Sequence, residues 1–167
     1  MSLTTELSLR LQTHRQNPLD LVTPRADMDL LVSRSLASGS GAGQADDDWS
    51  DERTLAGAAN EDLDFAAGGL TNAFGQTVTW ARVKGILVVA DPTNTTNLTV
   101  KPGASPLPFL TGTTPALAVL PPGGVFLLWV PSAAGILVTG GTGDLINVAN
   151  AAGASAKYRI VVLGGLT

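Results

Sequence analysis

The stretch Pro121-Pro-Gly-Gly-Val-Phe-Leu-Leu-Trp-Val-Pro131 indicates the fold class. Its first four residues are a strong turn signal, the apolar run 125–130 has the length of a buried strand, and Pro131 ends that strand. Similar units lie on both sides: the apolar run 86–89 precedes a turn at 91–94, and the Gly-rich turn 140–143 precedes a strand. This punctuation predicts short strands joined by tight turns.

The rest of the body follows the same pattern, and we expect about eight or nine strands in the chain. Those of the body lie over residues 61–66, 77–90, 97–101, 125–130, 136–139, 144–148 and 156–163, with a loop or short helical turn over 70–74. No long amphipathic helix is found, so the crossover connections of a parallel sheet are missing. The sequence therefore predicts an all-β fold, an antiparallel β-sandwich whose strand number suits a jelly roll.

An extended arm precedes this body. Residues 6–12 read Glu-Leu-Ser-Leu-Arg-Leu-Gln, which places Leu7, Leu9 and Leu11 on one face of a strand. Prolines 18 and 24 then break the chain, and residues 28–32 are compatible with a further short strand. Residues 38–43 have the composition of a flexible linker, which the acids 46–48 extend. We therefore expect an acidic N-terminal arm and linker over residues 1–48 and a β-sandwich body over residues 49–167.

Charge divides the chain in a similar way. Residues 1–64 carry a net charge of −7 and residues 65–167 one of +3, within a total of −4. This asymmetry fits an arm that lies on its own body or on a neighbour's, and equally acids that keep a mobile segment soluble. An arm with so little core of its own is stable only if its leucine face adds to a sheet edge or to a partner.

Composition narrows the function classes. The 167 residues include no Cys and a single His, His14, which excludes disulfides, thiolate metal sites and multi-histidine metal sites. The start of the chain lacks the pattern of a secretory signal, and Pro and Gly interrupt the apolar segment 116–138, so we expect no membrane helix. Only 14% of residues are charged and the mean hydropathy is +0.24. Apolar surface is therefore expected to be buried in a β-rich body or against another subunit.

Motifs that resemble catalytic sites are weak. Gly140-Gly-Thr-Gly-Asp144 lacks the Lys-Ser/Thr that follows a phosphate-binding loop, and it precedes a strand, which favours a β-turn. A serine triad would have to use His14 in the arm, and the chain has no Gly-x-Ser-x-Gly elbow. We assign no catalytic, cofactor-binding or metal-binding residue, and we expect a protein that is not an enzyme and needs no cofactor.

Acidic residues offer a second kind of candidate. One acidic cluster consists of Asp46, Asp47, Asp48, Asp51 and Glu52. It lacks the ligand spacing of an EF-hand, which favours a solvated linker over a Ca²⁺ site. A cation bound by Asp46, Asp48 and Asp51 is left open. Three further acids, Glu61, Asp62 and Asp64, alternate with Leu63 and Phe65. That alternation fits the wet face of a strand better than a glycosidase pair.

Aromatic and basic residues complete the candidates. The larger aromatics sit mostly within apolar runs, which favours core packing over a sugar-binding platform: Trp49, Trp80, Trp129, Phe65, Phe109 and Phe126. Basic residues are few and scattered, so the sequence gives little support for nucleic-acid binding.

Several segments also resemble one class of protein. They are Trp49-Ser-Asp-Glu-Arg-Thr-Leu55, Asn60-Glu-Asp-Leu-Asp64, Gly68-Gly-Leu-Thr-Asn-Ala-Phe-Gly75, Trp80-Ala-Arg-Val-Lys84, Val119-Leu-Pro-Pro-Gly-Gly124, Gly141-Thr-Gly-Asp-Leu-Ile146 and Tyr158-Arg-Ile-Val-Val-Leu-Gly164. Over residues 49–164 this pattern of turns and strands is similar to small virion structural proteins of tailed bacteriophages and prophages, and most similar to jelly-roll cement or decoration proteins of the capsid.

The resemblance implies a non-enzymatic protein of the capsid surface, made in the cytoplasm of the host bacterium. Its implied partners are the major capsid protein and further copies of itself, as a dimer or trimer, with no nucleic acid and no membrane. Such proteins bind across contacts between capsid subunits and oppose the internal pressure of the DNA. The alternative is a carbohydrate- or receptor-binding β-sandwich at a tail or spike, which needs exposed aromatics such as Trp49 or Trp129.

Overall fold

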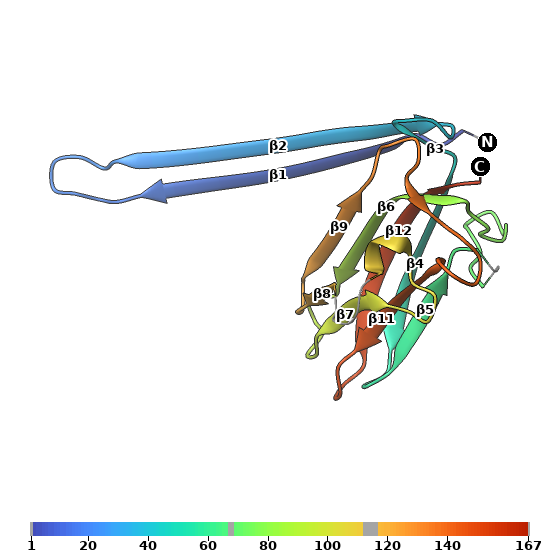
Figure 1. Ribbon diagram of the computed structural model, residues 1–167. Coiled ribbons are helices and arrows are strands. Elements are labelled where there is room, and N and C mark those ends of the chain that lie inside the picture. Colours follow the sequence, from blue (N-terminus) through green and yellow to red (C-terminus); the bar gives the residue numbers. More distant parts are fainter. Residues whose placement is uncertain (1, 67–68, 112–116, 167) are drawn as a thin grey trace.

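The computed structural model describes residues 2–66, 69–111 and 117–166 and confirms the all-β class. Two antiparallel sheets form a β-sandwich body, and a long β-hairpin extends from one end of it (Figure 1). The one helical element within the described ranges is the short 3-10 turn η1, Pro108–Leu110. Strand pairing is therefore the main way in which the described backbone groups are hydrogen-bonded.

The first sheet of the body has the order β10-β6-β12-β4, with β9 also paired to β6; the second has the order β5-β11-β7-β8. The bounds are β4 (Asp47–Leu55), β5 (Asn60–Asp64), β6 (Arg82–Ala90), β7 (Leu98–Pro102), β8 (Ala118–Leu120), β9 (Val125–Trp129), β10 (Ile136–Leu137), β11 (Leu145–Asn150) and β12 (Ala156–Gly165).

Strands that follow one another along the chain repeatedly change sheet. The chain crosses from one sheet to the other between β4 and β5, β5 and β6, β6 and β7, β8 and β9, β10 and β11, and β11 and β12. Strands distant in sequence are thereby paired, as β12 is with both β4 and β6. Two Greek keys would require crossings of this kind, and the jelly-roll topology itself stays a prediction.

Alternation along the strands places apolar side chains between the two sheets. Ile86 and Val88 of β6 and Ile160 of β12 lie in the same buried cluster as Val100 and Ile146 of the second sheet. These side chains are nearly inaccessible to water, and each contributes about 1.5–3 kcal/mol by burial. The core of the body is thus formed by alternate residues of both sheets, as the strand patterns predict.

Trp80 closes one end of this core. Its ring stacks on Phe65 with 5.6 Å between ring centroids, and its Nε1 donates a hydrogen bond to Asp47 Oδ2 at 2.7 Å. A Cβ atom on Gly164 would lie 2.3 Å from the Trp80 ring, so this strand position accepts only glycine.

The predicted arm is a β-hairpin. Strands β1 (Thr5–Gln16) and β2 (Arg25–Ser38) pair without a break from Thr5 opposite Leu36 to Gln16 opposite Arg25. The short strand expected over 28–32 is therefore part of a much longer one. Both prolines lie in the connecting loop, where they interrupt no pairing. At about 3.4 Å per residue the paired strands extend about 40 Å.

The expectation of a flexible linker over 38–43 is wrong, because hydrogen bonds hold this segment to the body. Strand β3 (Gln44–Ala45) runs parallel to the end of β2, and Gly43 N donates to Pro131 O at 2.7 Å. Gly43 has a φ of 68°, a conformation that glycine adopts without strain. Leu36 and Ala45 are fully buried in a small cluster with Leu163.

Lys84 strengthens this attachment. Its side chain is buried, and its ammonium donates hydrogen bonds to the carbonyl oxygens of Gly41, Ser132 and Ala133. Burial and the nearby charge of Arg82 lower the pKa of Lys84. One cation thus links the turn after the hairpin to a loop of the body.

The acidic extension of the linker is also wrong in part. Residues 47 and 48 begin β4, which continues through Trp49 and pairs with β12 along its length. The boundary expected near Trp49 therefore falls inside a strand. Two further differences are β8, which the sequence reading did not identify, and residues 77–81, which precede β6 rather than belong to it.

Replacing Lys84 with methionine tests the attachment of the hairpin. The substitution removes a charged donor from three carbonyl oxygens, and a hydrogen bond to a charged group contributes about 1.5–3 kcal/mol. We expect faster amide hydrogen exchange at Ala37 and Gly43 in Lys84→Met, with protection of β6 and β12 retained. Lys157→Met, at an exposed position, is the control. Unchanged exchange at Ala37 and Gly43 would contradict this role of Lys84.

Tyr158 is the chain's one tyrosine, which makes its titration easy to follow. Burial, and then the hydrogen bond from its hydroxyl to Glu61 at 2.6 Å, raise the pKa of Tyr158 far above its ordinary value of about 10. Because the folded state holds this proton more tightly, its contribution to stability is complete below about pH 10 and is lost as the pH rises further.

We therefore expect phenolate absorbance to appear only as circular dichroism reports unfolding. Tyr158→Phe should lose less stability than the native chain over the same alkaline range. Ordinary phenolate titration in a protein that is still folded would contradict the burial of Tyr158.

Candidate functional site: the apolar face of the β-hairpin

The register of the hairpin gives it one apolar face. Odd-numbered residues of β1 lie opposite even-numbered residues of β2, so that Leu9 faces Val32, Leu11 faces Leu30, and Thr13 faces Met28. Side chains of directly opposed residues share a face of the ribbon. We call this set the hairpin face: Leu7, Leu9, Leu11, Met28, Leu30 and Val32.

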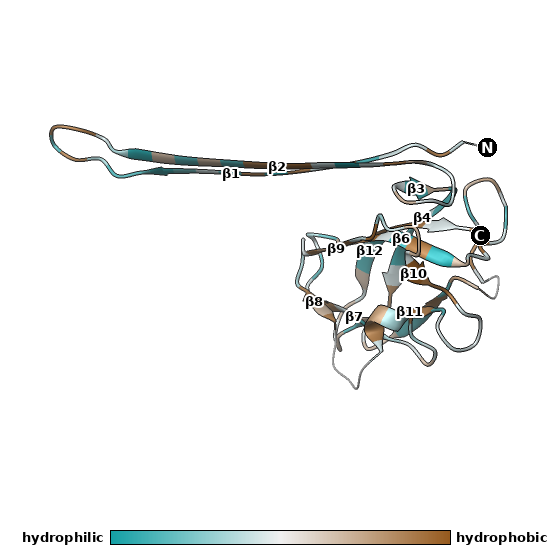
Figure 2. Cartoon of the chain, turned by 45° about the horizontal axis from the view of Figure 1, so that its top comes forward, coloured by the Kyte–Doolittle hydropathy of each residue, from teal (hydrophilic) through white to brown (hydrophobic). Residues whose placement is uncertain are grey.

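Most of the hairpin face is open to water. Leu9, Leu11 and Leu30 are each a little over half exposed, and Met28 is 48% exposed. Figure 2 shows apolar residues recurring along both strands of the projecting ribbon. Isolated two-stranded hairpins are at best marginally stable in water, and contiguous apolar patches mark interaction sites. The hairpin face is therefore the strongest candidate for a binding surface on this chain.

The opposite face of the ribbon carries paired charges. Arg10 contacts Asp29 at 2.6 Å, and Asp27 accepts hydrogen bonds from Arg25 and His14. These partners lower the pKa of both aspartates, Arg10 that of Asp29, and Arg25 followed by His14 that of Asp27. Five charged or titratable residues of this face are paired with one another: Arg10, His14, Arg25, Asp27 and Asp29. The other face carries two charged residues within the paired strands, Arg15 and Arg34, at the two ends of its apolar stretch.

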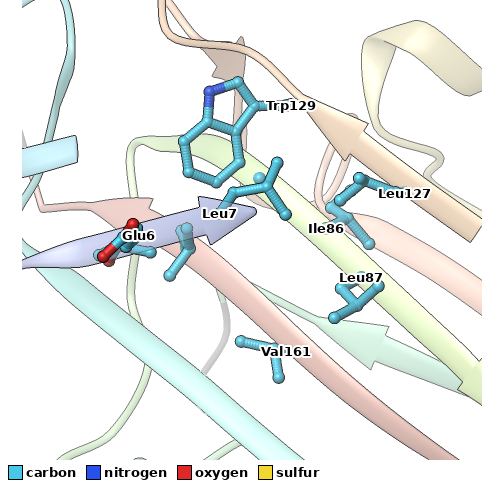
Figure 3. A pocket seen from close by; sticks show the side chains of 10 residues that line it. Glu6, Leu7, Ile86, Leu87, Leu127, Trp129 and Val161 are labelled. Atoms are coloured by element: carbon cyan, nitrogen blue, oxygen red, sulfur yellow. The ribbon is translucent and has the colours of Figure 1, made fainter. Parts of the chain in front are cut away.

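At its base the hairpin face contacts the body. Leu7 lines a pocket of about 120 Å³ together with Leu127 and Trp129 of β9, Leu87 of β6 and Val161 of β12 (Figure 3). These body residues project from the side of the first sheet that faces away from the core. We call this apolar part of the sheet the outer face: Leu87, Val89, Val125, Leu127, Trp129 and Val161.

The loop at the tip of the hairpin also carries exposed apolar residues. Leu19 and Val22 are more than half exposed and Leu21 is fully exposed. Asn17 N donates to Pro24 O at 3.2 Å, and Leu19 N donates to Val22 O at 3.1 Å. The backbone of the tip is thereby ordered, and its leucines point into solvent.

The Gly-rich candidate for a phosphate site is a turn in the structure. Asp144 Oδ2 accepts a hydrogen bond from Gly141 N at 2.5 Å, and Gly143 N donates to Thr139 O. Gly141 has a φ of 76°, which explains a glycine there. His14, the one possible member of a serine triad, lies on the hairpin and pairs with Asp27.

The acids singled out in the sequence are held by separate protein partners. Asp46 accepts from Leu166 N, Asp47 from Trp80 and Asn72, and Asp51 and Glu52 pair with Arg53 and Arg159 respectively. The carboxyl of Asp48 has a raised pKa because it is partly desolvated and lies near Asp47. Among the described residues no group of three or more acids or histidines could hold a metal ion.

The second acidic group lies on β5. Glu61 accepts hydrogen bonds from Tyr158 and Arg53, and Asp62 accepts one from Asn147 at 2.7 Å. Asp64 Oδ1 accepts from Ala66 N at 2.8 Å. Glu61 and Asp62 thus connect β5 to other strands of the body, and Asp64 holds the chain just after β5.

Most of the aromatic candidates belong to the core. Trp49, Trp80 and Phe65 are nearly inaccessible, and Phe109 and Phe126 pack against the same cluster. Trp129 is half-buried beside Leu7 at the base of the hairpin. Among the described residues Phe74 is the aromatic with large exposure, at 70%. The described aromatics therefore form no exposed platform of the kind that binds sugars.

Sequence reasoning missed half of the hairpin face and, apart from Trp129, which it considered as a sugar-binding aromatic, all of the outer face. The leucines of β1 were recognised by their alternation, but their partners in β2 were not. Residues 26, 28, 30 and 32 also alternate, and this was the available signal. Leu87, Leu127 and Val161 lie within continuous apolar runs, where alternation cannot show which side faces outward.

No family model, curated protein or solved structure matches this chain. None of the helical residues that the structure describes forms a helix long and apolar enough to cross a membrane.

The paired aspartates predict how the hairpin responds to acid. Their pKa values are lowered in the folded state, so their contribution is present above the unfolded pKa of about 3.9 and is lost as the pH falls below it. We expect the amide resonances of β1 and β2 to lose dispersion in acid while those of β6 and β12 keep it. Asp27→Asn with Asp29→Asn should weaken this dependence. Equal dispersion of the hairpin at both ends of the titration would contradict it.

Proposed function

We propose that this chain is a non-enzymatic structural protein of a tailed-phage virion, a cement or decoration protein on the outer surface of the capsid. The observation that carries the proposal is the hairpin face, an apolar surface projected well beyond a body that satisfies its own core. In this role the hairpin reaches from one capsid subunit to the next and resists their separation. The role needs no cofactor and no catalytic residue.

The attachment of the hairpin supports this role. A clamp transmits force only if its projecting element is fixed to its body, and Lys84, Leu36 and Gly43 fix the base of the hairpin by hydrogen bonds and burial. The strand order supports a jelly-roll body of the kind that the sequence resemblance implies. Many copies on one shell strengthen binding through multivalency even when each contact is weak.

The proposed partners are the major capsid protein and further copies of this chain, and the proposed location is the capsid surface after synthesis in the host cytoplasm. Nucleic acid and membranes are not among the proposed partners. The ten Lys and Arg residues are scattered over the sequence, and several are engaged in ion pairs. A cement role needs no contact with nucleic acid or with a membrane.

Immunogold electron microscopy of purified phage particles, with antibody raised against this chain, tests the proposal. We expect gold over the head at many sites. Gold confined to the tail tip would overturn the cement role in favour of the receptor-binding alternative. Absence of the chain from mass spectra of purified particles would overturn both.

A shortened hairpin tests the part played by the hairpin face. Replacing residues 10–31 with Asn-Gly closes the ribbon directly after Leu9 and Val32, which are opposed in the register, with a turn suited to two-residue hairpins. This variant keeps the anchored base and should fold. We expect it to sediment with capsids that lack the chain at least ten-fold less than the native protein does. Equal co-sedimentation would show that the hairpin is not the capsid-binding element.

A further inference from the structure

The hairpin face and the outer face are two walls of one apolar surface. They meet at the pocket where Leu7 lies against Leu127 and Trp129 (Figure 3). Beyond this pocket the ribbon leaves the body, and the two walls separate (Figures 1 and 2). Leu11 and Leu30 on one wall, and Val125 and Val161 on the other, stay exposed.

Leu7 brings the two walls together at the base of the hairpin. Its side chain comes from the hairpin face and lines one pocket with Leu127 and Trp129 of the outer face, so the two apolar surfaces face each other there within one chain. They do so only at the base, because a rigid ribbon that projects away cannot fold its remaining length back onto the sheet. The rest of each wall is left without a partner in its own chain.

The dimensions of the walls favour a contact that uses both of them. With about 3.4 Å per residue and about 4.8 Å between strands, the hairpin face covers about 400 Å² and the outer face, over three five-residue strands, about 240 Å². A stable interface buries at least about 600 Å² on each partner. One hairpin on one outer face is limited by the smaller wall to about 240 Å² on each partner, and a reciprocal pair of contacts doubles this to about 480 Å², which approaches that area.

Charge does not oppose this contact. The hairpin, residues 5–38, contains four acids and four arginines and so has no net charge. Its ion pairs between Arg10 and Asp29 and between Arg25 and Asp27 lie on the face opposite the apolar one. On the outer side of the body, the charged pair Arg159 and Glu52 is also self-satisfied and lies toward the β4 edge. Arg15 and Arg34 share the apolar side of the ribbon, opposite Ala26 and Leu7, and lie at the two ends of the stretch from Leu9 to Met28. This stretch can therefore lie on the outer face while both arginines stay at its margins.

We propose that two copies of this chain form a two-fold dimer in which the hairpin face of each copy lies on the outer face of the other. In such an isologous contact each chain gives and receives the same hairpin, and both walls are covered at once. The proposal deepens the cement role by making the hairpin face the contact between copies, which leaves the exposed tip residues Leu19, Leu21 and Val22 for the contact with the capsid. It rests on the self-association included in the proposed function. It is tested on the free protein, so its failure is distinct from failure to bind capsids.

Sedimentation velocity of the full chain is the first measurement, with the dimer expected as the main species at micromolar concentration. Leu30→Arg on the hairpin face and Val125→Arg on the outer face should each yield monomers, because each places a charge in the same interface. Leu31→Arg is the matched control: it changes a leucine one residue away, on the charged side of the ribbon, and should stay dimeric. Circular dichroism checks that each variant folds.

Disulfide cross-linking separates reciprocal exchange from other dimers, since the native chain has no cysteine. Leu30→Cys and a tagged Val161→Cys chain, mixed and oxidised, should form a mixed disulfide, and Leu31→Cys should not. A monomeric or trimeric native chain would overturn the proposal. A dimer that survives Val125→Arg would also overturn it, because the outer face would then lie outside the interface. Cross-links between two Leu30→Cys chains without the mixed product would do the same, because they would show the hairpins packing on each other.

Discussion

A two-stranded ribbon cannot bury an apolar face by itself, and the account of this protein depends on that constraint. In the body, each strand has a second sheet against which its apolar side packs. In the hairpin, Leu9, Leu11 and Leu30 have cross-strand neighbours but nothing above them. Burial that stabilises this ribbon must therefore come from outside the chain. The low charge and positive mean hydropathy of the sequence include this exposed apolar surface as well as the core.

The hairpin is useful as an interaction element only because its base is fixed. Lys84 joins the carbonyl oxygens of the turn after β2 to those of a loop in the body, and Leu36 is buried beside Leu163. Rigid attachment lowers the entropy lost on binding, since the projecting face is already oriented. An anchored base and an uncovered length together favour an element that connects subunits over one that completes its own domain.

Local patterns in the sequence predicted much of the body and only part of the hairpin. The turn at Pro121 and the runs 86–89 and 125–130 identified strands because their signals are contained in a few residues. β4 was missed because its acids resemble a solvated linker. The partners of these acids, Arg159, Trp80 and Asn72, lie far along the chain, so no local pattern reveals them. The Gly- and Ser-rich turn was read as flexible for the same reason, since composition does not reveal a buried lysine that holds it. The face shared by Leu11 and Leu30 depends on the hairpin register, which neither strand specifies alone.

The oxidation of Met28 tests the central claim most directly. Met28 is the chain's only methionine apart from Met1. It belongs to the hairpin face, and it is 48% exposed in the isolated chain. Peroxide converts accessible methionine to its sulfoxide, which peptide mass spectrometry quantifies. If the hairpin face is an interface, Met28 should oxidise at least several-fold more slowly in intact virions than in the protein diluted to monomers. Equal rates in the two states would show that the hairpin face stays open in the particle and would contradict the account.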